Sequence, residues 1–218
     1  MKEFDGIKNT ADHAARAFAS FFEKRYLPSH PSNNPNSSEA TTNGSTSTSI
    51  STPNTNESFP NPFQRRGYAK SLVEANRQNK LLFVYLHSPL HRKSDSFCAR
   101  ILSHPRVLTH LSTSFITWGG SIHTADGANV GRMLNVSAYP YVALLACNST
   151  SSTSVQPPRI DLLWKMESDV RYMPNHQLEE IPMEQFLTEI QVVLRSYDNV
   201  IADMETRRLR REEEVRLR

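Results

Sequence analysis

The run Leu81-Leu82-Phe83-Val84-Tyr85-Leu86 is the longest stretch of bulky apolar residues in the first half of this 218-residue chain. A run this short and this continuous is typical of a central β-strand that is covered on both faces. Residues 68–79 precede it with helical periodicity and place Ala69, Leu72 and Val73 on one face. The pattern therefore predicts a helix that leads into a buried strand.

The residues that follow alternate between helical and extended patterns. A helix is expected with Ser94 as its N-cap and with Phe97 and Cys98 buried, and another helix is expected to begin at Pro105. The last helix is expected to begin at Met183 with a heptad-like apolar seam. Three further strands are expected at Phe115–Trp118, Tyr141–Ala146 and Ile160–Trp164.

This order of elements predicts a thioredoxin-like α/β fold. A β-α-β unit is followed by a helix, a strand preceded by proline, a hairpin and a final helix. Pro140 stands directly before the third strand, where that fold uses a cis-proline. The expected architecture is this fold with a short N-terminal helix and a long, charged C-terminal helix.

The rest of the chain divides by composition. Residues 1–28 are expected to hold an amphipathic helix from Thr10 to Tyr26 that docks on the main domain. Residues 29–62 are expected to form a disordered linker or insert, because Ser, Thr, Asn and Pro dominate there. The main domain is placed at 63–198 and the start of a charged linker helix or coiled coil at 199–218.

Charge and hydropathy exclude several classes of protein. The net charge of +3 is too small to indicate a nucleic-acid partner, and no apolar run approaches the roughly 20 residues of a membrane span. The charge is unevenly placed, at +7 over residues 63–106 and −5 over residues 107–204. Two cysteines do not make a disulfide scaffold, and free thiols fit a reducing compartment.

The expected fold raises the question of redox chemistry. Such oxidoreductases need Cys-x-x-Cys at the start of the helix after the first strand, and this chain has Asp95 and Cys98 at those two places. A carboxylate cannot attack a disulfide, so Cys98 is expected to be a buried apolar residue and the protein not to be an enzyme. His87 and His91 could bind a metal with Asp95, but solvated loop histidines are the favoured interpretation. No cofactor is expected, since no nucleotide-binding glycine motif is present.

What remains is a candidate binding surface near the first strand. Its basic residues could receive a carboxylate, a phospholipid headgroup or an acidic partner surface, and the alternative is ordinary solvated charge. The candidate residues are His91, Arg92, Lys93, Arg65, Arg66 and Lys70.

Several segments resemble one family. The residues Phe63-Gln64-Arg65-Arg66-Gly67-Tyr68, Lys80–His87, Ser94-Asp95-Ser96-Phe97-Cys98 and Tyr139-Pro140-Tyr141 resemble the UAS domain of UBX-domain proteins of the Fas-associated-factor type. The Ser/Asn-rich insert suggests a fungal member. The resemblance covers the chain apart from that insert and the longer hairpin loop.

This resemblance implies a function that composition does not show. Such proteins are ubiquitin-pathway adaptors on the cytosolic face of the endoplasmic reticulum, the Golgi or lipid droplets, and some are subunits of membrane ubiquitin-ligase complexes. A UBX domain recruits the valosin-containing AAA ATPase. This chain lacks the membrane segment and the UBX domain, so it is expected to be a soluble fragment: a non-catalytic adaptor segment in endoplasmic-reticulum- or Golgi-associated degradation of membrane proteins.

Two alternatives stay open. Some UAS domains bind long-chain unsaturated fatty acids and self-associate in response, so the chain could be a lipid-responsive sensor. A redox or metal enzyme is the third possibility, and it depends on Cys98, His87 and His91.

Overall fold

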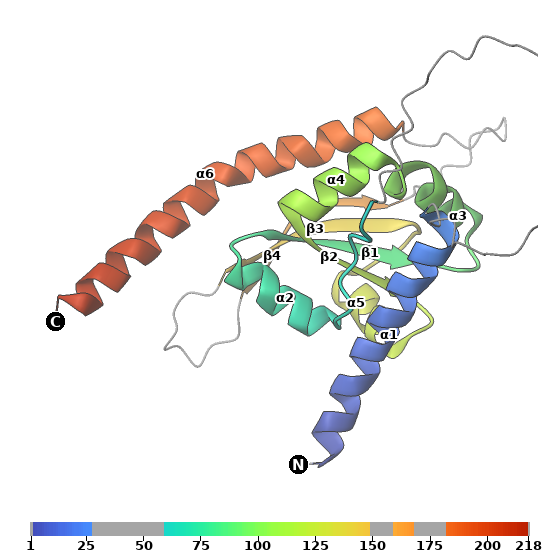
Figure 1. Cartoon of the computed structure of the whole chain (residues 1–218), viewed down its shortest axis with the longest axis horizontal. Coiled ribbons are helices and arrows are strands. Elements are labelled where there is room, and N and C mark those ends of the chain that lie inside the picture. Colours follow the sequence, from blue (N-terminus) through green and yellow to red (C-terminus); the bar gives the residue numbers. More distant parts are fainter. Residues whose placement is uncertain (1, 28–58, 149–158, 168–181, 218) are drawn as a thin grey trace, which may run out of the picture.

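A computed structural model describes residues 2–27, 59–148, 159–167 and 182–217 (Figure 1). In chain order the elements are α1 (Lys2–Tyr26), α2 (Tyr68–Arg77), β1 (Leu81–His87), α3 (Arg92–Phe97), the π-helical turn η1 (Cys98–Leu102), α4 (Pro105–Ser114), β2 (Phe115–Ser121), α5 (Ala125–Met133), β3 (Tyr141–Asn148), β4 (Arg159–Glu167) and α6 (Met183–Arg216).

The strands form one mixed sheet in the order β2-β1-β3-β4. β1 and β2 are parallel, while β3 runs antiparallel to both β1 and β4. The Tyr139–Pro140 peptide bond immediately before β3 is cis, as the position of Pro140 predicted. The expected thioredoxin-like α/β order is thus confirmed, with the four strands in their expected places.

Helices cover both faces of this sheet, and each face has its own core. On one face, residues of α1, α3, η1, α4 and α6 pack against alternate residues of β1 such as Phe83 and Tyr85. On the other face, α2 and α5 pack against Leu82, Val84 and Leu86. All of these β1 residues are fully buried, which explains why the strand has an unbroken apolar sequence.

The N-terminal helix is longer than its sequence pattern indicated. α1 begins at Lys2, before the expected start at Thr10. Asp12 is a buried residue within the helix. Ala15, Phe18, Ala19 and Phe22 form its buried stripe, and this stripe joins the core beside β1 and β2.

Two local predictions were wrong. The buried side of α2 consists of Tyr68, Ser71, Leu72 and Ala75, whereas Ala69 is exposed and Val73 is 65% exposed. α3 begins three residues earlier than expected, with His91 as its N-cap in place of Ser94, because a turn ends at His91. Ser94 is therefore a buried residue inside the helix and not its cap.

The last helix links the domain to the charged C-terminal sequence without a break. Phe186, Leu187 and Ile190 of α6 are buried, and beyond them Figure 1 shows the helix leaving the body of the domain.

Of the predicted 29–62 linker, the structure describes only residues 59–62. In that part, the Asn61 side chain donates to the Ala19 carbonyl of α1 at 2.7 Å. No helix among the described residues is both long enough and apolar enough to cross a bilayer.

Candidate functional site

The carboxyl ends of the parallel strands β1 and β2 meet at one edge of the sheet. β1 ends at His87 and β2 at Ser121, and these two residues are register partners. Ile122 donates its backbone N–H to the His87 carbonyl at 3.1 Å, while Leu86 is paired with Tyr141, the residue after cis-Pro140. This edge is where an α/β sheet of this kind most often places a ligand or a reactive group.

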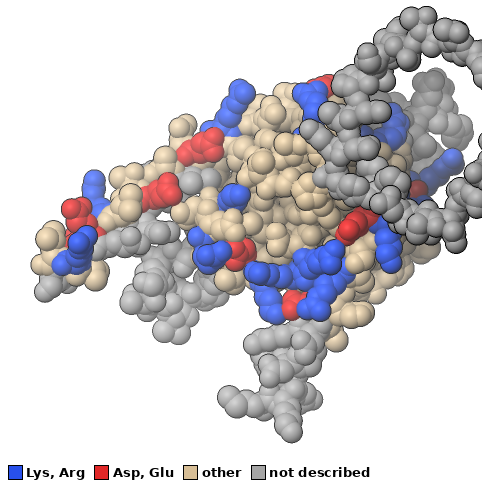
Figure 2. Space-filling model, viewed as in Figure 1, with Lys and Arg blue, Asp and Glu red and all other residues tan. Residues whose placement is uncertain are grey.

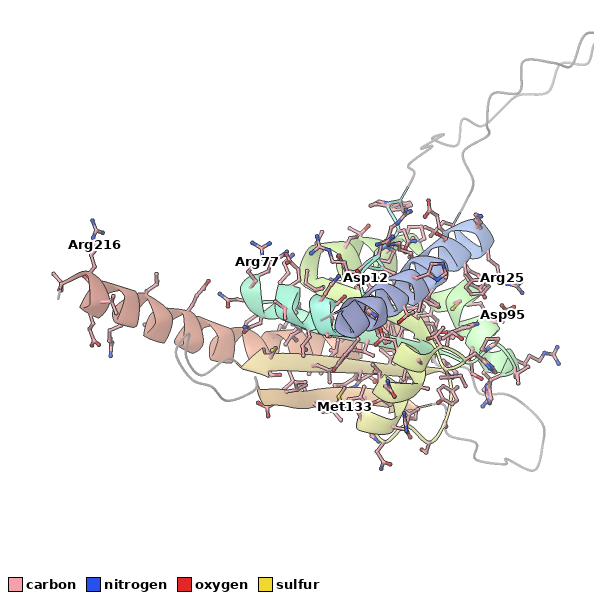
Figure 3. The ribbon with its side chains drawn as sticks, turned by 90° about the horizontal axis from the view of Figure 1, so that it is seen from below. Asp12, Arg25, Arg77, Asp95, Met133 and Arg216 are labelled. Atoms are coloured by element: carbon pink, nitrogen blue, oxygen red, sulfur yellow. The ribbon has the colours of Figure 1, made fainter. Side chains whose placement is uncertain are left out.

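Asp95 lies at this edge, where a dithiol enzyme would have its first cysteine. Its carboxylate is held by the last turn of α1: Arg25 donates from Nε and Nη2 to the two carboxylate oxygens at 3.1 and 3.2 Å, and the Tyr26 hydroxyl donates to Oδ1. Figure 3 shows Arg25 and Asp95 together at one end of α1. The Tyr26 hydrogen bond and then the Arg25 hydrogen bonds lower the pKa of Asp95. The carboxylate therefore stays ionised and serves as an anchor for α1.

The thiol of Cys98 is enclosed in the core. Its residue is fully buried, and the Tyr85 hydroxyl lies 3.1 Å from Sγ. Burial raises the pKa of the Cys98 thiol to about 12, so the nucleophilic thiolate is essentially absent at neutral pH. The prediction that Cys98 is a buried apolar residue is confirmed.

His87 is buried, and the prediction of a solvated loop histidine was wrong for this residue. It is 4% exposed at the end of β1, and its Nδ1 lies 3.1 Å from the Tyr85 hydroxyl and 3.9 Å from Cys98 Sγ. Burial lowers the pKa of His87 to about 4, so its imidazole is neutral at physiological pH. His91 is half-buried at the N-cap of α3.

Aromatic residues of α1 cover this cluster. The Phe21 and Phe18 rings lie 5.3 and 6.1 Å from the His87 ring, and Phe18 meets Phe63 edge-to-face at 5.2 Å. Gly119 of β2 makes this close approach possible, because a Cβ there would lie 2.1 Å from Cε1 of Phe18. α1 can therefore pack closely on β2, whereas a larger residue at position 119 would occupy the space of the Phe18 ring.

A second polar anchor fixes α1 near its middle. Asp12 accepts the backbone N–H of Gly67 at 2.8 Å and also pairs with Lys70. Asp126 of α5 accepts the next N–H, that of Tyr68, at 3.1 Å. Gly67 is the N-cap of α2 and offers no side chain of its own, so two carboxylates from other helices cap α2 instead.

The six predicted binding residues fall into two groups that differ in their ion pairing. Figure 2 shows Lys and Arg gathered over α1 and α2, with Asp and Glu among them. Three of the predicted residues belong to this ion-paired surface. Their pairs are Arg65–Glu23, Arg66–Glu74 and Lys70–Asp12.

The other three predicted residues lie at the start of α3, beyond the Arg25 end of α1. Arg92 is exposed and Lys93 is partly buried, and no carboxylate among the described residues forms an ion pair with either. These two cations therefore differ from Arg65, Arg66 and Lys70 in being available to a partner.

Sequence reasoning missed Arg25, Tyr26 and Tyr85 as site residues. Arg25 and Tyr26 are distant from Asp95 in sequence, and nothing in their own spacing indicates the contact. Tyr85 is part of an apolar strand, and its hydroxyl group was the feature that could have indicated a polar contact. Among the described residues, no group of three His, Cys, Asp or Glu side chains is placed to hold a metal ion.

Comparison with known proteins places the chain beside UBX-domain proteins. It is 34% identical to the plant UBX domain-containing protein 10 of Arabidopsis thaliana over 90 residues, which cover 41% of this chain and 19% of the plant protein. It is 29% identical to human FAS-associated factor 2 over 126 residues, which cover 54% of this chain and 28% of the human protein. The matches to these two relatives therefore span less than a third of either relative's length.

Comparisons of structure gave more distant neighbours. A thioredoxin from Thermus thermophilus aligns with a TM-score of 0.45 and 20% identity, over 58% of this chain and 82% of the thioredoxin. A DsbH oxidoreductase aligns with a TM-score of 0.46 and 10% identity, over 61% and 85%. No protein-family model matches the chain. The chain is therefore a thioredoxin-like α/β protein that is similar in sequence to part of UBX domain-containing proteins and of FAS-associated factor 2.

Proposed function

We propose that this chain is a non-catalytic adaptor segment in a ubiquitin-dependent pathway. The proposal rests on the residues at the two positions that hold the reactive cysteines of a dithiol enzyme. Asp95 is bound by Arg25 and Tyr26, and Cys98 is a buried thiol with a pKa of about 12. Neither group can start thiol–disulfide exchange, which needs an accessible thiolate.

The relatives support the adaptor role. Two of them are named as a UBX domain-containing protein and as FAS-associated factor 2. A UBX domain that recruits the valosin-containing AAA ATPase would belong to the parts of those proteins outside the match. In this proposal the chain contributes a binding domain and a rigid helical spacer, α6, and the protein works on membrane proteins at the cytosolic face of the endoplasmic reticulum or Golgi.

A complementation experiment tests the proposal. Cells that lack the protein are expected to accumulate ubiquitylated membrane proteins, and the natural protein carrying Cys98→Ala is expected to restore their turnover fully. Asp95→Asn is the matched control, because it alters the same edge of the sheet without touching a thiol. Failure of Cys98→Ala alone, at unchanged protein abundance, would mean that the thiol acts chemically and that the adaptor proposal is wrong.

The absence of exchange chemistry can be measured directly on the purified chain. Insulin reduction in the presence of dithiothreitol is expected to proceed at the rate of buffer alone. A rate above buffer that disappears with Cys98→Ala would contradict the proposal.

A further inference from the structure

The turn between β1 and α3 presents an apolar residue at its tip. The His91 backbone N–H donates to the Ser88 carbonyl at 3.1 Å, so Pro89 and Leu90 are the two central residues of the turn. Leu90 is 87% exposed, the highest value among the large apolar residues that the structure describes. Ser at the first position and Pro at the second suit such a turn, and its third position accepts most residues. The turn itself therefore gives no reason for a leucine.

Two cations, Arg92 and Lys93, follow this leucine after His91, and their position does not favour the local structure. Arg92 and Lys93 are the first two residues of α3, where a helix favours acidic side chains and disfavours basic ones. Neither side chain has an ion-pair partner among the described residues, and Asp95, the acidic residue of the same turn, pairs with Arg25 instead. An exposed leucine that the turn does not require thus stands beside two cations at a helix start that favours acidic residues. Such departures from local preference are expected at functional positions.

We propose that the Pro89–Lys93 segment is a docking tip for an anionic lipid bilayer. Leu90 enters the interface between headgroups and acyl chains, and Arg92 and Lys93 meet the lipid phosphates and carboxylates. Insertion removes the exposed leucine from water, and each cation near an anionic leaflet adds about 1 kcal/mol of attraction. The apex of a turn offers no free strand edge to a peptide and stands clear of its surroundings, which favours a bilayer over an acidic polypeptide.

The tip is separate from the ion-paired surface over α1 and α2. There the carboxylates of Asp12 and Glu74 lie beneath Lys70, Arg66 and Arg77, with 10% and 17% of their side-chain surface exposed. These carboxylates offset most of the positive charge. The docking tip is therefore assigned to residues 89–93 alone.

Vesicle co-sedimentation of the full chain tests the proposal. Binding to phosphatidylcholine vesicles that contain phosphatidylserine is expected to exceed binding to pure phosphatidylcholine, and to weaken as salt is added. Leu90→Asn is expected to lower the partition coefficient at least about tenfold. The double variant Arg92→Glu/Lys93→Glu is expected to lower it at least about 30-fold.

Matched controls and a stability measurement make the outcome decisive. Val73→Asn removes another exposed apolar residue, and Arg132→Glu/Arg195→Glu reverses two other exposed cations; neither control is expected to change binding by more than about twofold. Both tip variants are expected to unfold at the same or higher urea concentration than the parent, because asparagine suits the turn and glutamate suits the start of α3.

Three results would overturn the proposal. The first is no preference for phosphatidylserine. The second is equal loss of binding in the tip variants and the controls. The third is binding of poly-glutamate, but not of vesicles, through the same three residues, which would assign the tip to an acidic polypeptide. The proposal is independent of the adaptor function, and failure of either leaves the other standing.

Discussion

Asp12 provides the sharpest test of how α1 is held on the domain. Replacing it with alanine removes the acceptor for the Gly67 N–H, which is buried beneath the helix, and leaves that group without a partner. A hydrogen bond from a buried N–H to a charged acceptor contributes about 1.5–3 kcal/mol. The ion pair with Lys70 adds at most about 1 kcal/mol, because the Lys70 side chain is 51% exposed. We expect Asp12→Ala to lower the free energy of unfolding by about 2–3 kcal/mol.

Equilibrium unfolding in urea measures this loss, and two further variants separate its parts. Asp12→Asn keeps an oxygen for the Gly67 N–H but loses the charge, so a loss of about 1 kcal/mol is expected. Lys70→Ala removes only the exposed partner and is expected to cost at most about 1 kcal/mol. If Asp12→Ala costs no more than Lys70→Ala, the Gly67 hydrogen bond does not hold α1 and the reasoning is refuted.

The same variant has a pH signature. The Gly67 hydrogen bond and then Lys70 lower the pKa of Asp12 below its ordinary value of 3.8. Because the folded-state pKa is depressed, the carboxylate stabilises the protein fully above the unfolded pKa, and this contribution is lost as the pH falls below about 4. The stability of Asp12→Ala is therefore expected to fall less steeply in that acidic range than the stability of the parent.

Three other outcomes follow from the packing around α1. Gly119→Ala is expected to destabilise the protein by about 1–3 kcal/mol in urea unfolding, since the new methyl group overlaps the Phe18 ring; a neutral result would show that α1 shifts freely on β2. The parent is expected to lose stability as the pH falls from about 6.5 to about 4, because the pKa of His87 is about 4 in the folded state and about 6.5 in the unfolded state, so the unfolded state takes up the proton first. His87→Leu is expected to remove this part of the loss. An unchanged pH dependence of the free energy of unfolding would contradict the burial of this ring. In the Cys147→Ala variant, which keeps only Cys98, Ellman's reagent is expected to label the thiol only in denaturant. Rapid labelling of the native variant would show that the Cys98 thiol is accessible.

The fold was largely predictable because its signals are local and consistent. The apolar run of β1 has the composition of a strand buried on both faces, and the structure buries every residue of it. Pro105 stands in the first turn of α4, and Pro140 forms the cis peptide before β3. In each case one short segment carries enough information to determine its own conformation.

The candidate site was less predictable because its contacts join distant segments. Arg25 and Asp95 are 70 residues apart in sequence, and Asp12 and Gly67 are 55 apart. Periodicity identifies α1 as amphipathic, but it does not show which surface receives the helix. Val73 illustrates the same limit, because it matches a helical face in the sequence but lies on the exposed side of α2.

The residue at position 95 connects the absence of a Cys-x-x-Cys motif at this place to the docking of α1. A cysteine there would need an accessible position and a stabilised thiolate to react, whereas a carboxylate there can accept hydrogen bonds from Arg25 and Tyr26 at once. With α1 seated in this way, Phe18 and Phe21 cover His87, and burial keeps the neighbouring Cys98 thiol protonated. The edge of the sheet that serves catalysis in dithiol enzymes is thereby part of the core of this protein. A partner that reaches this edge of the sheet must contact residues that α1 leaves exposed there, and Arg92 at the start of α3 is such a residue among the predicted binding residues.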